Sequence, residues 1–354
     1  MMMNYKLIMI SFIFLTLFSC KKKEDENVET TTPTSEDTGY LHGKFVVNEG
    51  NFLSNNGSIS FIGEDEILND VYQIVNGVEL GDVLQSFTVI GERGYAILNN
   101  SQKIVVVDLK SMQHVATITG MDYPRYLIDG GNGSAYITNG SFAGQVYILD
   151  LASNTLTGNI PVGNGPEKMW LDGDHLFVCN SGGWDLDATV SVIDVNTNAV
   201  INTIDVGDRP MDIVQDFSGD IWVMCSGNDG WMVGGETLAS LYRINHTSQV
   251  VETSSVIGSA GVHPKHIAAN AAGTIIYYEL NGIKSVTLGE DEPVEATFLN
   301  ESVGSIDVDP STGDIWTTSV SDYVNPSVIS CYSTTGELKA SYTAGLISSS
   351  IIFN

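Results

Sequence analysis

The sequence predicts an all-β fold, a seven-bladed β-propeller of four-stranded antiparallel blades, and three observations support this prediction. Short runs of alternating or β-branched apolar residues, broken by Gly, Asn and Asp, fill the chain from Gly43 onward and indicate strands. One of these runs returns about every 40 to 55 residues, as an internal repeat does. A Gly-x-x-Pro element recurs between repeats, for example in VGNGP from Val162 and in VGDRP from Val206.

The recurring run sets the number of blades. Its copies are KFVVNEG at Lys44, GYAILNN at Gly94, SAYITNG at Ser134, HLFVCNS at His175, DIWVMCS at Asp220, TIIYYEL at Thr274 and DIWTTSV at Asp314. Each copy anchors one unit, so seven units fill residues 43–354. Repeated units of this length that hold several short strands are typical of propeller blades.

One unit illustrates the four strands of a blade. They are expected at Pro166–Gly173, Asp174–Ser181, Thr189–Val195 and Ala199–Gly207. Gly and Pro mark the crossing from the outer strand of one blade to the inner strand of the next. Pro ends the old strand and fixes φ, whereas Gly permits the bend. The pairs that fit this pattern are Gly120 with Pro124, Gly163 with Pro166, Gly207 with Pro210, and Gly261 with Pro264.

The two ends of the repeat array complement each other. The first unit begins at its second strand, at Lys44, with no inner strand before it. The last residues form a lone apolar strand, Ser348–Phe353. We expect this strand to supply the missing inner strand of the first blade, because such pairing removes the exposed edges that an open ring would carry.

The first 42 residues differ from the rest. Lys6 and the apolar stretch Leu7–Phe18 are too short to span a bilayer and are typical of a secretory signal. The chain is therefore expected to divide into a signal peptide at 1–19, a tether at 20–42 and the propeller at 43–354. The tether has few apolar residues to bury and should be flexible.

The composition excludes some classes of function. Acidic residues number 43 and basic residues 15, for a net charge of −28, which argues against a nucleic-acid partner. No nucleophile-elbow or His-Glu-x-x-His motif is present, and the six His are scattered, so we expect no metal centre and no cofactor. Calcium in the loop Trp184–Asp187 is a weak alternative, because that loop offers only two carboxylates.

Three cysteines lie within the predicted propeller: Cys179, Cys225 and Cys331. An odd number in an exported domain argues against a disulfide framework. We expect small buried residues. A bridge between Cys179 and Cys225, which occupy matching points of successive repeats, is the alternative.

The longest connections join the second and third strands of each unit, and they open on the same face as the crossings. Binding residues usually lie in such loops on a rigid scaffold. The loops combine apolar and aromatic side chains with amides, which suits a large amphiphilic ligand carrying amide groups, or a glycan. The alternative is that these side chains fold back onto the blade tops. The candidate ligand-binding residues are Asn48, Asn51, Phe52, Asn99, Asn139, Phe142, Asn180, Trp184, Trp231, Met232 and Tyr323.

Basic residues recur at the crossings near the expected axis, and they stand out in so acidic a chain. Arg125, Lys168 and Arg209 are the candidates for binding a phosphate or carboxylate of a ligand. The equally weighted alternative is that they neutralise neighbouring carboxylates, such as Glu167 and Asp212.

Several motifs resemble known families. YITN at Tyr136, VSVID at Val190 and the VGxxP crossings are together similar to the YVTN repeat of YncE-like and surface-layer propeller proteins. The segment Phe45–Phe61 resembles the opening of propeller surface lipoproteins of Bacteroidetes. Among these, BtuG-type proteins capture cobalamin and pass it to a TonB-dependent outer-membrane transporter.

The N-terminal residues carry a related resemblance. LFSC, ending at Cys20, resembles the lipobox in which the Cys becomes lipidated, and Lys21–Glu26 resembles the export signal that sends lipoproteins to the outer face of the outer membrane. An ordinary signal peptide with an incidental Cys is the alternative.

These resemblances imply an outer-membrane lipoprotein, held to the membrane through its lipid alone and facing the cell exterior. They imply a non-enzymatic protein that carries cobalamin or a related corrinoid as a ligand and delivers it to a TonB-dependent transporter. The alternatives from other classes are a propeller enzyme such as a lactonase, and a surface scaffold that binds a protein or a glycan.

Overall fold

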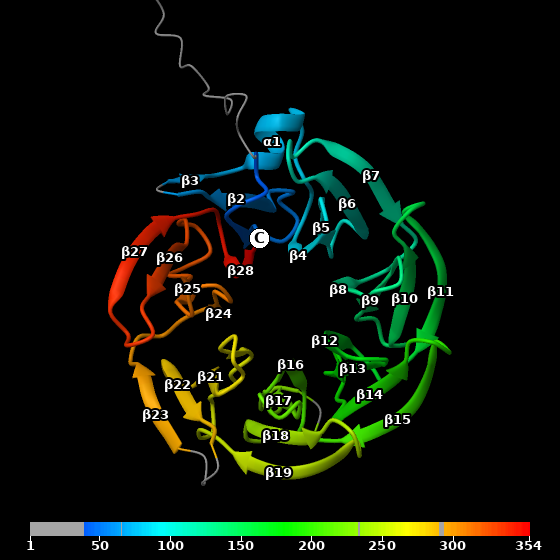
Figure 1. Cartoon of the computed structure of the whole chain (residues 1–354), viewed down its shortest axis with the longest axis vertical. Helices are drawn as coiled ribbons and strands as arrows, with labels where there is room; N and C mark the ends of the chain where they lie inside the picture. Colours follow the sequence, from blue (N-terminus) through cyan, green and yellow to red (C-terminus); the bar gives the residue numbers. More distant parts are fainter. Residues whose placement is uncertain (1–38, 65, 233, 290–293) are drawn as a thin grey trace, which may run out of the picture. The chain divides into compact units, whose positions relative to one another are not determined.

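The computed structural model describes residues 39–64, 66–232, 234–289 and 294–354. They form seven four-stranded antiparallel sheets, which stand around a central axis like the blades of a propeller (Figure 1). The prediction of a seven-bladed β-propeller is confirmed. The proposed signal peptide, Cys20 and nearly all of the proposed tether lie outside the described residues. Within the described part of the chain, no helix is long and apolar enough to cross a membrane.

The first three blades run as follows, from the innermost strand outward. Blade 1 holds β28 (Ser348–Phe353), β1 (Lys44–Asn48), β2 (Ser58–Ile62) and β3 (Ile67–Leu68). Blade 2 holds β4 (Leu84–Ile90), β5 (Arg93–Leu98), β6 (Lys103–Asp108) and β7 (His114–Thr119). Blade 3 holds β8 (Pro124–Asp129), β9 (Ser134–Asn139), β10 (Gln145–Asp150) and β11 (Thr155–Pro161).

The other four blades follow in the same order. Blade 4 holds β12 (Pro166–Asp172), β13 (His175–Asn180), β14 (Thr189–Asp194) and β15 (Ala199–Asp205). Blade 5 holds β16 (Pro210–Gln215), β17 (Ile221–Cys225), β18 (Ser240–Asn245) and β19 (Val250–Val256). Blade 6 holds β20 (Ile267–Ala269), β21 (Ile275–Glu279), β22 (Ile283–Thr287) and β23 (Val294–Leu299). Blade 7 holds β24 (Ser305–Val308), β25 (Ile315–Ser319), β26 (Val328–Tyr332) and β27 (Leu338–Thr343).

The hydrophobic core lies between blades. The second and third strands carry apolar residues on both sheet faces, so each blade packs against both of its neighbours. One cluster, for example, joins Phe177 and Val192 of blade 4 to Ile213 and Val223 of blade 5. Stability is therefore spread around the ring, and each blade depends on contact with the next.

The cysteines are part of these interfaces. Cys179 and Cys225 belong to the same cluster, and they and Cys331 are free thiols. The alternative of a bridge between Cys179 and Cys225 is therefore wrong. Burial raises the pKa of the Cys225 thiol to about 12, which keeps it protonated and unreactive at neutral pH.

The predicted ring closure is confirmed. β28 pairs antiparallel with β1, from Lys44 opposite Phe353 to Asn48 opposite Ser348. Ile351 of this strand is only 2% exposed and packs with Val46 and Trp316. The last strand of the chain thus bridges blade 7 and the start of the ring.

The structure differs from expectation at the first blade. β3 has only two residues, and the helix α1 (Val71–Asn76), which the sequence analysis did not predict, follows it. Tyr72 of α1 is buried in one cluster with Phe61 of β2, so the helix supplies packing that a longer outer strand would give. The ring of Tyr40 also packs edge-on against Phe61, with ring centroids 5.0 Å apart, which places the expected boundary at Gly43 inside the packed region.

We predict that Ile351→Ala lowers the free energy of unfolding by about 2 to 5 kcal/mol, because it opens a cavity where the ring closes. Leu338→Ala, at an exposed position of the outer strand β27, is the control and should change stability by about 0.5 kcal/mol or less. Urea unfolding of both variants measures this. Equal midpoints for the two variants would contradict a structural role for closure.

Candidate functional site

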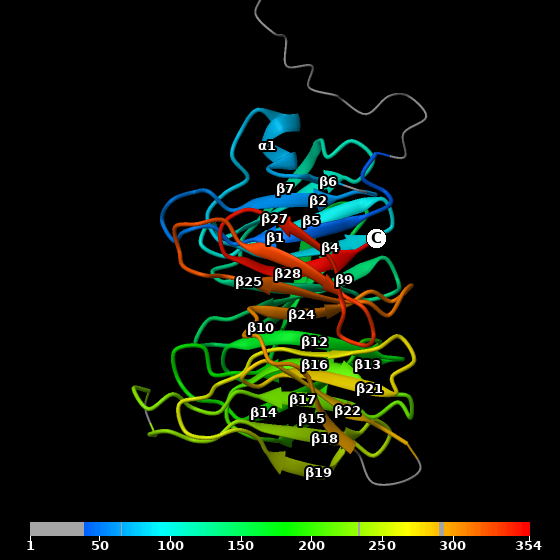
Figure 2. The ribbon, with the colours of Figure 1, turned by 90° about the vertical axis from the view of Figure 1, so that its left-hand side faces the viewer.

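Strand order divides the connections between two faces. The loops between second and third strands and the crossings between blades lie on one face, and the remaining turns lie on the other with the two ends of the propeller. Figure 2 shows the first face at the left and the chain end marked C at the right. We call the first set of loops the loop rim; it comprises residues 49–57, 99–102, 140–144, 181–188, 226–232, 234–239, 280–282 and 320–327. We call the opposite face the turn face.

Five aromatic side chains of the loop rim point into solvent. They come from blades 1, 3, 4, 5 and 7, and each is between 64% and 74% exposed: Phe52, Phe142, Trp184, Trp231 and Tyr323. The alternative that they fold back onto the blades is wrong for these five. Met232 does fold back, being 9% exposed with its sulfur against the guanidinium of Arg209.

The rim loops are fixed by hydrogen bonds to their neighbours. The amide of Asn51 donates to the backbone oxygen of Tyr323 at 2.7 Å, which joins the loops of blades 1 and 7. The backbone N–H of Leu53 donates to the carboxylate of Asp82 in the next crossing at 3.0 Å. Phe52, between these two anchors, is therefore held on a loop of defined shape although its ring is exposed.

The loop of Trp184 is fixed through Asp187. One oxygen of this carboxylate accepts from the backbone N–H of Asn164 at 2.8 Å, and the other accepts from the hydroxyl of Thr189 at 2.7 Å. Both oxygens are thus used to tie the loop to the crossing before β12 and to the start of β14. Across the ranges that the structure describes, no group of three or more His, Cys, Asp or Glu is placed to hold a metal ion.

Four predicted amide ligands are used inside the fold. Asn48, Asn99, Asn139 and Asn180 are all buried at or beside the ends of second strands. The amide of Asn48 donates to the Ser60 hydroxyl at 2.9 Å and accepts from that of Ser348 at 2.7 Å. These four amides therefore tie strands and crossings together, and they are not available to a ligand on the rim.

The other three amides are also hydrogen-bonded within the fold. Asn180 donates to the Ser191 hydroxyl at 2.9 Å, Asn99 donates to the carbonyl of Pro124 at 3.2 Å, and Asn139 accepts from the backbone N–H of Tyr123 at 2.8 Å. At Asn99 and Asn139 the amide satisfies a backbone group of a crossing that has no strand partner, whereas the amide of Asn180 bonds side chains of β14. Of the predicted asparagines, only Asn51 stays partly accessible.

The basic residues at the crossings are paired with carboxylates. Arg125 of blade 3 lies 2.9 Å from the Glu167 carboxylate of blade 4, and Lys168 of blade 4 lies 2.7 Å from that of Asp212 of blade 5. Arg209 is 3.9 Å from Asp229. The alternative in which these cations neutralise neighbours therefore describes the structure, and the first two pairs link three successive blades around the axis.

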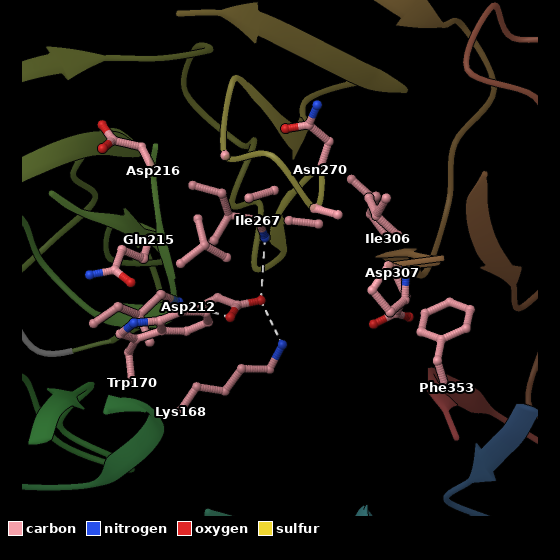
Figure 3. A pocket seen from close by; sticks show the side chains of 18 of the residues that line it. Lys168, Trp170, Asp212, Gln215, Asp216, Ile267, Asn270, Ile306, Asp307 and Phe353 are labelled. Carbon is pink, nitrogen blue, oxygen red and sulfur yellow. Dashed lines mark hydrogen bonds and ion pairs between the residues drawn. The ribbon is translucent and has the colours of Figure 1, made fainter. Parts of the chain in front are cut away.

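A second feature, missed by the sequence analysis, is a pocket on the propeller axis. It has a volume of about 730 Å³ and is lined by the inner strands β12, β16, β20, β24 and β28. The turns at Phe217, Asn270 and Pro310 also line it, so it opens toward the turn face. Figure 3 shows the Lys168–Asp212 pair on one side of the pocket and Asp307 on the other.

The titratable groups in and beside the pocket differ in their environments. Burial alone would lower the pKa of Lys168, but Asp212 beside it raises that pKa above its usual value. Burial and the nearby Lys168 lower the pKa of His266 to about 3, which leaves this imidazole neutral. Burial raises the pKa of Asp307 to about 6, against the opposing effect of Lys168. Asp307 is thus the carboxylate of the pocket whose charge is least compensated.

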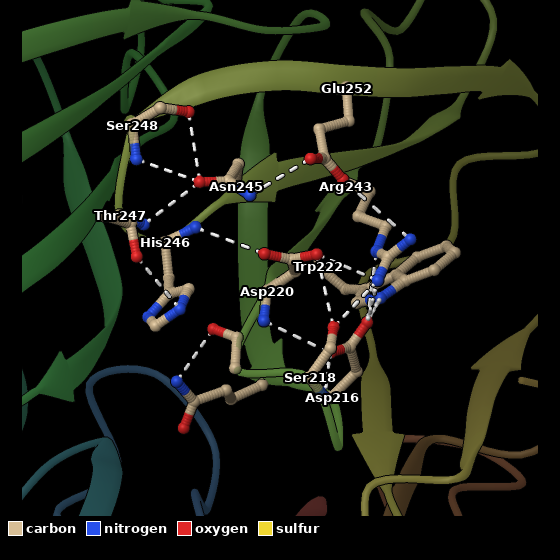
Figure 4. A network of polar contacts seen from close by, with 12 residues as sticks. Asp216, Ser218, Asp220, Trp222, Arg243, Asn245, His246, Thr247, Ser248 and Glu252 are labelled. Carbon is tan, nitrogen blue, oxygen red and sulfur yellow. Dashed lines mark hydrogen bonds and ion pairs between the residues drawn. The ribbon is translucent and has the colours of Figure 1, made fainter.

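Asp216, another carboxylate that lines this pocket, differs from Asp307 because it is paired with a cation. Asp216 accepts from the indole N–H of Trp222 at 2.9 Å and lies 3.1 Å from the guanidinium of Arg243, which also reaches Asp220 at 2.8 Å (Figure 4). Although burial would raise the pKa of Asp216, hydrogen bonds from Ser218 and Trp222 hold it below its usual value. This network locks a turn of blade 5 and leaves Asp216 fully partnered.

Comparison with known proteins places the chain in a family. Residues 42–344 match the family described as "Domain of unknown function (DUF5074)". The chain belongs to this family. It is also 28% identical over 116 residues to the Seven-bladed beta-propeller protein Rv1057 of Mycobacterium tuberculosis. That alignment spans 32% of this chain and only 29% of the relative.

Two solved structures share the fold. A quinonprotein alcohol dehydrogenase-like protein from Bacteroides thetaiotaomicron has a TM-score of 0.64 at 16% identity, over 89% of this chain and 78% of the other. Hydrazine synthase of Kuenenia stuttgartiensis has a TM-score of 0.58 at 14% identity, over 82% and 95%. At these identities the likeness extends to the propeller architecture alone.

We predict that Asp307→Asn stabilises the protein at pH 8. The folded-state pKa of about 6 lies above the ordinary value of 3.8, so the ionised carboxylate opposes folding above pH 6. Two pKa units correspond to about 3 kcal/mol at most, and this gain should shrink as the pH falls from 6 toward 4.

Thermal unfolding of the wild type and the variant across this pH range measures the effect. Asp205→Asn, at an exposed position of β15, is the matched control and should leave the profile unchanged. A lower stability of Asp307→Asn at pH 8 would mean that the carboxylate is well compensated, contrary to the environment described for it in the pocket.

Proposed function

We propose that this propeller is a capture protein that binds a large amphiphilic ligand on its loop rim. The five exposed aromatic side chains of the rim carry the proposal. Exposed apolar groups that gather on one face of a soluble protein usually mark a binding surface, and aromatic residues contribute most of the affinity there. Their loops are tied in place, so little ordering would oppose binding.

The ligand we favour is cobalamin or a related corrinoid. A corrin ring has apolar faces that can stack on aromatic side chains, and its edge carries amide groups that can hydrogen-bond to loop backbone and to Asn51. The choice of this ligand rests on the resemblance of residues 45–61 to BtuG-type lipoproteins. We propose further that the protein is not an enzyme and passes its ligand unchanged to a TonB-dependent transporter.

The proposed location depends on the N-terminal residues. Lipidation at Cys20 would hold the propeller at the outer membrane, facing the exterior, because several acyl chains on one Cys anchor a protein firmly. We predict that Cys20→Ala moves the protein from the membrane fraction to the soluble fraction and abolishes labelling by radioactive palmitate. A variant that stays in the membrane fraction would contradict anchoring by this Cys.

Calorimetric titration with cyanocobalamin tests the ligand. We predict binding at 1:1 stoichiometry, weakened about tenfold or more by Trp184→Ala and by Trp231→Ala, since each removes a stacking surface. Phe217→Ala is the matched control: it removes an exposed aromatic ring from the turn face and should leave the affinity unchanged.

The outcomes separate the alternatives. Absence of heat would exclude cobalamin as the ligand, and turnover of a lactone by the same sample would favour the enzymatic alternative. Equal losses in all three variants would show that the rim aromatics do not form the contact surface.

A further inference from the structure

The axial pocket holds a carboxylate that lacks a cation. Asp307 accepts one backbone hydrogen bond, from the N–H of Ile351 at 3.0 Å, and a long one from the Ser305 hydroxyl at 3.4 Å. Within the described ranges, no Lys, Arg or His lies within 4.0 Å of its carboxylate oxygens. Burying a carboxylate without a counter-charge is unfavourable.

The repeat makes this carboxylate unusual. The backbone N–H groups of Asp216, Asn270 and Asp309 all bond across the same turn of their blades, to the carbonyls of Asp220, Ile275 and Asp314. These bonds align the inner strands of blades 5, 6 and 7. Two residues earlier, at matching positions, they carry Val214, Ala268 and Asp307.

A carboxylate therefore occupies a position that is apolar in the two preceding blades. The backbone hydrogen bond that Asp307 accepts from Ile351 needs only a neutral oxygen, so it does not account for an ionisable group here. Departures from a local rule of this kind are concentrated at functional sites. Asp307 is also the residue that faces the open volume of the pocket across from the Lys168–Asp212 pair (Figure 3).

The charges that act on Asp307 leave one negative charge in excess. Lys168 and Asp212 act on it across the pocket, and they are already paired with each other at 2.7 Å. The neutral His266 adds no charge, and the neighbouring strands β20 and β28 contain no charged residue. A cation that entered this pocket would find Asp307 as its partner.

The apolar side chains that line the pocket favour an organic cation over a metal ion. Trp170, Ile306 and Phe353 line the pocket with apolar surface, and the small side chains of Ala268 and Ala269 leave room. A volume of about 730 Å³ lies within the range of small-molecule sites. A bare metal ion would need several oxygen ligands close together, which this arrangement does not offer.

We propose that the axial pocket is a second binding site, for a small organic molecule that carries one primary ammonium group on an aromatic or branched apolar body. The ammonium donates hydrogen bonds to Asp307, and the body lies against Trp170 and Phe353. Because the pocket opens on the turn face, a ligand bound in it does not contact the aromatic side chains of the loop rim. Its test is therefore separate from that of the proposed capture function.

Tryptamine is the probe, and tryptophol, which has a hydroxyl in place of the amine, is its matched control. At pH 8 calorimetry should show one tryptamine bound per chain and an affinity for tryptophol lower by about tenfold or more. Asp307→Asn should weaken tryptamine binding by a similar factor. Trp231→Ala, on the rim, should not change it.

Two further measurements keep the test decisive. Ala269→Leu, which fills the pocket and leaves Asp307 in place, should also weaken tryptamine binding, and circular dichroism confirms that each variant is folded. The affinity should fall as the pH drops through about 6, where Asp307 takes up a proton. Equal affinity for tryptamine and tryptophol, undiminished binding to Asp307→Asn, or no binding at millimolar tryptamine would each overturn the proposal.

Discussion

The pairing of β28 with β1 is the constraint on which the rest of the structure depends. Each blade is stabilised by its two neighbours, and a ring of such units is complete only when the last strand joins the first. The same pairing positions Ser348 against Asn48, which fixes the base of the first rim loop, and Ile351 against Asp307 in the axial pocket. Closure thus determines the geometry of both candidate sites.

The architecture can be predicted from the sequence because each blade repeats the same pattern of strand and turn residues. Gly-x-x-Pro recurs between blades, as at Gly163 and Gly207. The unpaired strand Ser348–Phe353 matches the one inner strand that the first blade lacks. The orientation of individual side chains leaves no such pattern in the sequence. Asn48 and Asn51 look alike in the sequence, yet the first is buried under a crossing and the second reaches across to the next loop.

Asp307 was missed for a related reason. In a chain with 43 acidic residues a single Asp does not stand out, and its significance appears only once the inner strands are aligned by their hydrogen bonds. α1 was missed because six residues with two buried side chains give no helical periodicity to detect. Conversely, the exposure of Trp184 and Trp231 follows the sequence-based expectation, since aromatic residues in long polar loops have little apolar surface to cover them.

The hydrogen bond from Ile351 to Asp307 has a consequence for the whole ring. It joins the terminal strand to blade 7 at the pocket wall. The pocket therefore keeps its shape only while the terminal strand is paired and the ring is closed. A molecule that binds the pocket only when the terminal strand is paired must, by thermodynamic linkage, stabilise that pairing. A ligand bound on the axis would then stabilise the pairing of the terminal strand and slow the fraying of the chain end and the separation of the first blade.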